Sequence, residues 1–316
     1  MMTRTYLAAA LLLLALGLGA PTAQTAPASQ DEASSVVIYL PLIMHNAFEP
    51  VIAFATNREG NFEIYVVNPR SMTMRNVTGH EAQDLAPAFG PRGLLAWASA
   101  RDGNWEIYSG DLYGRNTRRL TFDPGVDYDP TWSPEGRRIA FSSGRSGNMD
   151  IWAMDANGTS LVNLTAQPSQ QRQPAWSPDG RTIAYASDEG GKDDIYIMGA
   201  DGSSKTRLTD LPSSHEQFPA WSADGQWIIF TTDLNGKPEL YAIHVERRTL
   251  QPVRSGSVFD AEGSWSGDGK RVAFRSTGGD GNTDLYVINF DGIGLGSGLR
   301  RLTIHNSDDI QPAWSR

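Results

Sequence analysis

From residue 50 onward the chain alternates short apolar runs with polar turns, and the same order of runs occurs six times. The copy at residues 167–210 shows this order most clearly. Its runs are rich in β-branched and aromatic residues, as strands are, and lie at residues 174–177, 182–186, 194–198 and 206–209. A Pro-Asp-Gly turn separates the first two runs, with proline presetting φ and glycine able to take positive φ. One copy therefore predicts a four-stranded antiparallel meander.

A large aromatic residue near the end of each first run fixes the period. These aromatic residues are Phe89, Trp132, Trp176, Trp221, Trp265 and Trp314, spaced 43 to 49 residues apart. Four-stranded repeats of this length are typical of β-propeller blades. Residues 51–78 supply only the second, third and fourth strands of a copy, and the missing first strand stands at residues 311–315. We predict an all-β, six-bladed β-propeller over residues 50–316, closed by a C-terminal strand that joins the N-terminal blade.

The residues before the first repeat have a different composition. An apolar run at residues 7–19 follows one basic residue and ends in small residues, as secretory signal peptides do, so residues 1–23 are assigned to a signal peptide. The run is short for a membrane span, and its retention as a signal anchor is the alternative. Residues 24–49 are expected to be a linker with a short apolar strand, which either docks on the propeller or forms an interaction segment. A cleaved signal peptide and a retained signal anchor both predict export to the periplasm or the extracellular space.

Composition and charge exclude several classes of function. The chain has no cysteine, which excludes disulfides, thiolate metal sites and a cysteine nucleophile. Its net charge is −9 and its 27 basic residues are scattered, so we expect no nucleic-acid partner. We expect a monomer that uses no cofactor and that has no stable membrane span after signal cleavage.

The repeated segments also resemble a known family. The P-A-W-S-P-D-G, I-A-F, G-N-x-D-I-Y and R-L-T segments are similar to those of the six-bladed propeller of the TolB family, over about residues 50–316. The resemblance implies the propeller fold and a protein-binding propeller face. TolB proteins also carry an N-terminal α/β domain, and we expect this chain to lack it because the stretch between signal peptide and first blade is too short.

One polar residue recurs three places before the proline position of each first strand. The set is Asp84, Asp127, Gln171, Glu216, Asp260 and Asp309. Because first strands line the channel of a propeller, we interpret the set as an acidic ring at one channel mouth. Such a ring favours a cation or a basic peptide end. The alternative is that each side chain braces its own turn.

Arginines on the same face are distributed unevenly. Arg58, Arg101 and Arg145 begin the turn between the second and third strands of three consecutive copies. In the other copies we align Asp188, Asp233 and Thr277 with them. Arg172, beside Gln171, adds to this asymmetry. We hypothesise that the acidic ring and these arginines bind a protein or peptide partner of cationic character; arginines paired with neighbouring acids are the alternative.

Candidates for catalysis are few. His80, His215 and His305 lie in loops of this face, where histidines hold a divalent metal in propeller enzymes such as oligogalacturonate lyases, but we interpret them as turn residues and expect no metal. No Gly-x-Ser-x-Gly nucleophile motif is present. We predict a non-enzymatic binding module. The alternative is a carbohydrate-binding protein or a metal-dependent polysaccharide lyase on the same scaffold, with Trp105 and Phe218 stacking on sugars.

Overall fold

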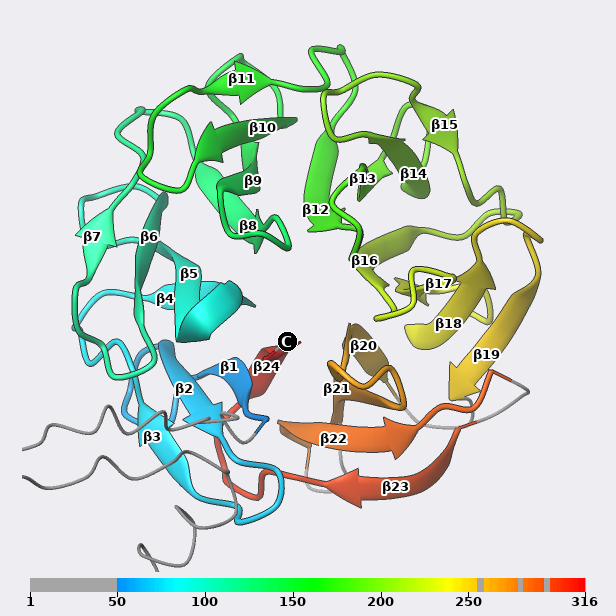
Figure 1. The fold of residues 1–316 in the computed structure, drawn as a ribbon. Helices are drawn as coiled ribbons and strands as arrows, with labels where there is room; N and C mark the ends of the chain where they lie inside the picture. The colour runs from blue at the N-terminus through cyan, green and yellow to red at the C-terminus, as the bar shows by residue number, and fades with distance from the viewer. Residues whose placement is uncertain (1–49, 255–258, 278–280, 293–295, 316) are drawn as a thin grey trace, which may run out of the picture. The chain divides into compact units, whose positions relative to one another are not determined.

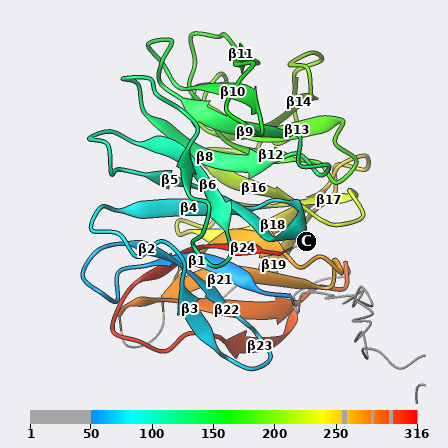
Figure 2. The same ribbon diagram turned by 60° about the vertical axis from the view of Figure 1, so that its left-hand side comes forward.

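The chain winds into six four-stranded antiparallel sheets around a central channel, as the computed structural model shows (Figure 1). It describes residues 50–254, 259–277, 281–292 and 296–315. The predicted signal peptide (residues 1–23) and the predicted linker (residues 24–49) lie outside these residues. Figure 2 shows the ring obliquely, with β11 near the top and β23 at the bottom.

We name the sheets blades A to F and give their strands from the channel outward. Blade A holds β24 (Asp309–Trp314), β1 (Ile52–Thr56), β2 (Glu63–Val67) and β3 (Met74–Asn76). Blade B holds β4 (Asp84–Phe89), β5 (Leu94–Ser99), β6 (Glu106–Asp111) and β7 (Arg118–Arg119). Blade C holds β8 (Asp127–Trp132), β9 (Arg138–Ser143), β10 (Asp150–Asp155) and β11 (Val162–Asn163).

The remaining blades repeat this order. Blade D holds β12 (Gln171–Trp176), β13 (Thr182–Ser187), β14 (Asp194–Gly199) and β15 (Thr206–Arg207). Blade E holds β16 (Glu216–Trp221), β17 (Trp227–Thr232), β18 (Glu239–His244) and β19 (Leu250–Arg254). Blade F holds β20 (Asp260–Trp265), β21 (Arg271–Thr277), β22 (Thr283–Asn289) and β23 (Ser297–Arg301). The fold class predicted from the repeats is confirmed.

Helix is almost absent from the described ranges. They contain one 3₁₀ turn, η1 (Pro91–Gly93), and none of their helical segments has the length and apolar character needed to cross a membrane. The turn-rich, helix-poor sequence is thus matched by an all-β structure.

The ring closes by the predicted strand exchange. β24 pairs antiparallel with β1, with Ile52 opposite Trp314 and Thr56 opposite Asp309. Figure 1 shows the last strand, red, beside the first, blue. This pairing occupies the edges that a linear array of blades would leave open.

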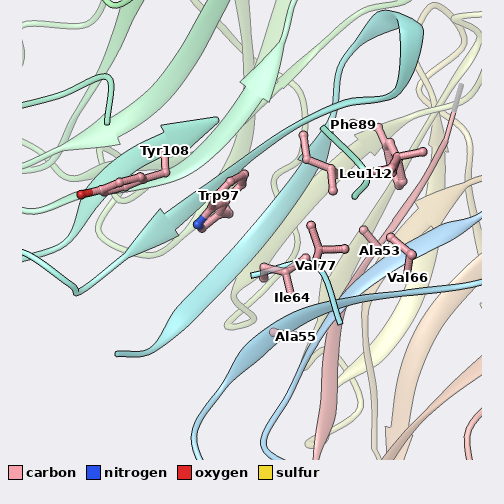
Figure 3. Close-up of a cluster of buried hydrophobic side chains, with 10 residues drawn as sticks. Ala53, Ala55, Ile64, Val66, Val77, Phe89, Trp97, Tyr108 and Leu112 are labelled. Carbon is pink, nitrogen blue, oxygen red and sulfur yellow. The ribbon is translucent and has the colours of Figure 1, made fainter. Parts of the chain in front are cut away.

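The core lies between the faces of neighbouring blades. At the A/B junction, Ala53, Ile64 and Val66 of blade A pack with Phe89 and Trp97 of blade B (Figure 3). Five similar clusters fill the other junctions. Because every blade buries apolar side chains on both faces, a blade cannot be removed without exposing two clusters.

Each channel-lining strand carries the same backbone distortion. A non-glycine residue with φ between +51° and +58° stands just before the proline position in all six strands: Ala86, Asp129, Gln173, Phe218, Glu262 and Gln311. The register to the second strand shifts there, as at a β-bulge. The bulge turns one residue per blade toward the channel.

Candidate binding face

One face of the propeller carries the turns between second and third strands together with the linkers that lead from one blade to the next. We call it the mouth face. The asparagine of the G-N-x-D segment joins the two sets of loops: Asn104 Nδ2 donates to the carbonyls of Asp123, at 2.8 Å, and Gly125, at 3.3 Å. Asn61, Asn148 and Asn282 bond their own linkers in the same way. The repeated asparagine is therefore a scaffold residue.

The six residues interpreted from the sequence as an acidic ring at the channel mouth are buried. Each of them is 0% exposed: Asp84, Asp127, Gln171, Glu216, Asp260 and Asp309. They lie beneath the turns of the mouth face. Asp84, Asp127 and Asp309 each bond an arginine in the turn of their own blade, as the turn-bracing alternative describes. The part of all six residues in binding a partner stays a prediction.

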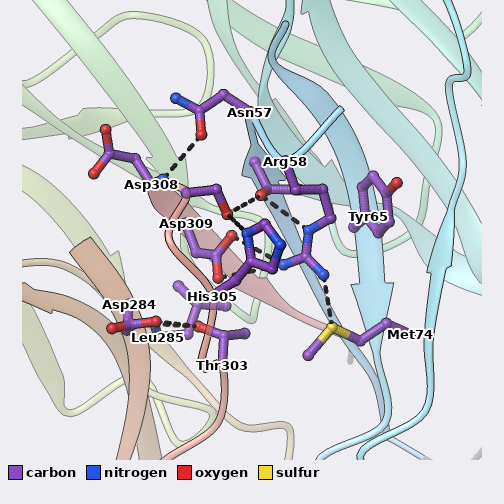
Figure 4. A network of polar contacts seen from close by, with 12 residues as sticks. Asn57, Arg58, Tyr65, Met74, Asp284, Leu285, Thr303, His305, Asp308 and Asp309 are labelled. Atoms are coloured by element: carbon purple, nitrogen blue, oxygen red, sulfur yellow. Dashed lines mark hydrogen bonds and ion pairs between the residues drawn. The ribbon is translucent and has the colours of Figure 1, made fainter. Parts of the chain in front are cut away.

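The three arginines named from the sequence pair with three of these acids. The Nη2 atoms lie 3.1, 3.0 and 2.7 Å from carboxylate oxygens in the pairs Arg58–Asp309, Arg101–Asp84 and Arg145–Asp127. Each guanidinium also bonds a hydroxyl at the end of the second strand, as Arg58 Nε does with Thr56 Oγ1 at 3.1 Å. Figure 4 shows Arg58 between Asp309 and Met74, near Tyr65. These three arginines are therefore paired with neighbouring acids, which was the alternative interpretation of the sequence.

Strand register corrects the alignment of the other blades. Arg58 stands two residues after Thr56, which pairs with Glu63, and the same position is Glu189 in blade D and Leu234 in blade E. Asp188 and Asp233 do not replace the arginines, and neither does Thr277. The aspartates match Asn57: all three accept a linker N–H, from Gln170 at 2.7 Å, from His215 at 2.7 Å and from Asp308 at 2.9 Å. The blade F counterpart of Arg58, at position 278, lies outside the described residues.

This register explains why one member of the buried set is neutral. In blades E and F the buried acid pairs with a cation from another position. Lys192 Nζ lies 3.6 Å from Glu216, and Arg254 Nε lies 2.9 Å from Asp260. Blade D has Glu189 at the position where blades A, B and C have an arginine that pairs with the buried acid. Gln171 of blade D is the one amide among the six buried residues. A buried carboxylate without a cation is costly, whereas an amide carries no charge.

The residues that face the channel are those at the bulges, of which the sequence analysis named only Phe218. Their side chains bond backbone N–H groups of the next blade: Glu262 Oε2 accepts from Gln311 N at 2.8 Å, and Gln311 Oε1 accepts from Ala86 N at 2.8 Å. Gln173 Oε1 accepts from Phe218 N at 2.9 Å. Ala86 and Phe218 have no side-chain acceptor, so this chain of bonds around the channel stops after each of them.

Two carboxyl groups that line the channel, those of Asp129 and Glu262, have raised pKa values. Burial raises the pKa of Asp129 to about 7, and the charge of Glu262 adds to the shift, although Asp129 keeps partial access to the channel. Burial also raises the pKa of Glu262, whose Oε2 lies 2.9 Å from Arg275 Nε. The surrounding cavity, of about 210 Å³, is lined by all six first strands. Polar groups thus converge on a space large enough for one side chain or a chain end.

Arg172 belongs to the channel-lining strand β12 and is partly exposed. Its Nη1 is 3.9 Å from the buried Asp193, which also has His215 Nδ1 at 3.5 Å and accepts a bond from Gln217. The structure thus gives Arg172 a local acidic partner. The arginine remains accessible to a ligand on one side, with 37% of its side chain exposed.

The histidines occupy turns. His80 Nδ1 accepts from Ala82 N at 3.0 Å, and His305 Nδ1 lies 2.9 Å from Ser307 Oγ. Across the described ranges, no three histidine, aspartate or glutamate side chains are grouped as a metal ion would require. Trp105 meets Tyr128 edge to face at 5.2 Å, and Phe218 lines the channel.

The most exposed large apolar side chains of the described residues also lie on the mouth face. Ile304 is 77% exposed and Phe122 is 72% exposed. Both follow a Leu-Thr pair in a linker, and Val126, 41% exposed, stands in the same linker as Phe122. The equivalent residues of three other blades are small or charged, namely Gly79, Ala166 and Asp210.

Comparison with known proteins agrees with this architecture. The model of the family described as TolB beta propeller domain matches residues 123–217 and 212–316. A search of curated protein sequences found no significant match.

Solved structures with the same fold are numerous. TolB from Acinetobacter baumannii is 22% identical with a TM-score of 0.72, over 85% of this chain and 67% of that one. The putative TolB from Agrobacterium tumefaciens is 23% identical with a TM-score of 0.66, over 81% and 88% of the two chains. An oligogalacturonate lyase in complex with manganese is 13% identical with a TM-score of 0.58, over 81% and 74%. At these identities the likeness establishes the fold.

Proposed function

The chain belongs to the TolB β-propeller domain family, and from that premise we propose that it is an exported, non-enzymatic module that binds a protein or peptide partner on its mouth face. Export rests on the apolar run at residues 7–19.

The observation that carries this proposal is the exposure of Phe122 and Ile304. Two large apolar side chains more than two-thirds exposed, on the same face and at repeat positions where other blades have small or charged residues, favour contact with a partner. Burying them would remove apolar surface from water at about 25 cal/mol per Å².

The channel supplies the polar part of the proposed contact. Asp129 and Glu262 favour an amine or guanidinium in the partner, and the bulge amides offer further hydrogen bonds. This retains the cationic partner expected from the sequence but assigns its recognition to the bulge residues, since the outer acids are buried and paired.

Carbohydrate binding is the second candidate. Trp105 and Tyr128 form an edge-to-face aromatic pair, and aromatic faces are what a sugar ring stacks on. A lyase activity lacks a grouped metal site in the described residues.

A paired experiment tests the proposal. The full chain is used to capture partners from an envelope extract, and the same preparation is applied to a glycan array. We expect a protein retained in proportion to the bait, and no glycan signal. Specific glycan binding without a protein partner would reverse the order of the two candidates.

A further inference from the structure

A basic groove lies between blades F and A on the face opposite the mouth face. We call it the junction groove and define it by Arg70, Arg271 and Arg300. Its volume is about 400 Å³, and none of the described residues that line it is acidic. Asn68 and Asn289 add amide groups to its wall. In a chain of net charge −9, a groove with three cationic and no acidic lining residues stands out.

The three guanidinium groups are only partly engaged by the protein. Arg300 Nη2 donates to the carbonyl of Pro69 in the next blade. Arg271 lies over the Trp314 ring at 5.1 Å and has Asp268 at 3.6 Å. Arg70 is exposed, and the structure gives its guanidinium no hydrogen bond or ion pair with another described residue. A guanidinium has five N–H donors, so most donors of the groove remain available.

The position of Arg70 is fixed although its side chain is unpaired. Asn68 Oδ1 accepts the backbone N–H groups of Arg70, at 2.8 Å, and Ser71, at 3.1 Å. Gly298, with φ of +66°, stands beside the Asn289 amide, and a Cβ there would lie 2.5 Å from Asn289 Nδ2. A side chain at position 298 would therefore crowd the wall of the groove.

The junction groove departs from the repeat. The three equivalent positions at every other junction hold at most one cation. They are Val51, Arg75 and Tyr113 at the A/B junction; Leu94, Arg118 and Asn157 at B/C; Arg138, Val162 and Asp201 at C/D; Thr182, Thr206 and Glu246 at D/E; and Trp227, Gln251 and Asp291 at E/F. The groove between blades D and E has three acidic lining residues, Asp179, Asp224 and Glu246, and one arginine, Arg247. Scaffold requirements, which are common to all junctions, do not account for three arginines at one of them.

We propose that the junction groove binds an oxyanion of the phosphate class. Guanidinium groups match the geometry of phosphate oxygens with paired N–H bonds, and an anion between them offsets the repulsion of three like charges. Water takes up about 30 Å³ per molecule in the liquid, so the groove has room for a phosphate group and for the organic group that carries it. The ligand is inorganic phosphate, a soluble phosphomonoester or the headgroup of an anionic lipid, which share this chemistry.

Calorimetric titration of the full chain with inorganic phosphate tests the site. We expect saturable binding, and Arg70→Gln should weaken it roughly tenfold or more. The Arg70 guanidinium makes no hydrogen bond or ion pair with another described residue, so its removal costs the protein no internal contact. The matched control is Arg118→Gln, because Arg118 Nη2 donates to the Ala156 carbonyl at 2.8 Å as Arg300 does to Pro69, but in a junction without the other arginines. The control should bind phosphate as the unchanged protein does.

Vesicles identify the source of the anion. Flotation with phosphatidylcholine vesicles, with and without phosphatidic acid, should show binding that depends on Arg70 if the ligand is a lipid headgroup. Phosphate binding without vesicle binding assigns the site to a soluble anion, either inorganic phosphate or a phosphomonoester. The proposal is overturned if neither phosphate nor vesicles bind, or if Arg70→Gln and the unchanged protein bind equally.

Discussion

The guanidinium of Arg58 lies 3.1 Å from the carboxylate of Asp309, although the two residues stand at opposite ends of the propeller sequence. The pair joins the turn after β1 to the start of β24, where the ring closes. Asn57 adds a second bond across the same closure by accepting the N–H of Asp308 at 2.9 Å. Closure is thus held by buried polar contacts as well as by strand pairing.

Replacing Arg58 with glutamine should destabilise the propeller by about 3–5 kcal/mol, because the buried Asp309 carboxylate would lose its cation. Urea unfolding of the full chain measures this loss. Arg115→Gln is the control, since its pair with Asp111 has an arginine side chain that is 69% exposed and should contribute about 1 kcal/mol or less. Equal losses in the two variants would contradict the account of closure.

Gln171→Asp should lower stability by about 3–5 kcal/mol, because blade D offers no arginine to the buried position. Adding Glu189→Arg to this variant should restore most of the loss by recreating the pair of Arg145 and Asp127, 2.7 Å apart in blade C. The four members of this double-mutant cycle are compared by urea unfolding. If Gln171→Asp leaves stability unaltered, or if Glu189→Arg does not rescue it, the absence of an arginine at position 189 is not the reason why residue 171 is uncharged.

Asp129 predicts a specific dependence of stability on pH. Its folded pKa, about 7, is raised above the unfolded value of 3.8, so the folded state binds the proton more tightly. The contribution of this group to stability is therefore present below pH 4 and is lost as the pH rises to about 7. The difference in unfolding free energy between the unchanged protein and Asp129→Asn should fall over that interval. A constant difference would exclude the raised pKa.

Sequence reasoning predicted the fold because the information is repeated. The aromatic residues at Trp132 and Trp176 fix the period, and the unmatched strand at residues 311–315 identifies the closure without any structural information. Six copies of one pattern allow a weak signal in any one strand to be checked against the others.

The candidate site was harder to predict, because sequence alignment does not show which way a side chain points. Asp84 and Ala86 are two residues apart, yet the bulge that follows Leu85 turns Ala86 toward the channel, whereas Asp84 does not line it. An alignment shifted by one position also paired Arg58 with Asp188 rather than Glu189. The usable signal was the variety at the bulge position, where Asp129, Phe218 and Glu262 differ while their neighbours repeat.

The most direct test of the proposed mouth-face binding compares three baits in one quantitative capture experiment from envelope extract. They are the unchanged chain, the double variant Phe122→Ser with Ile304→Ser, and the control Leu161→Ser, whose side chain is 41% exposed next to the outer strand of blade C. The account predicts that the double variant loses the partner at least tenfold while the control retains it. Equal retention of the partner by all three baits would contradict the account.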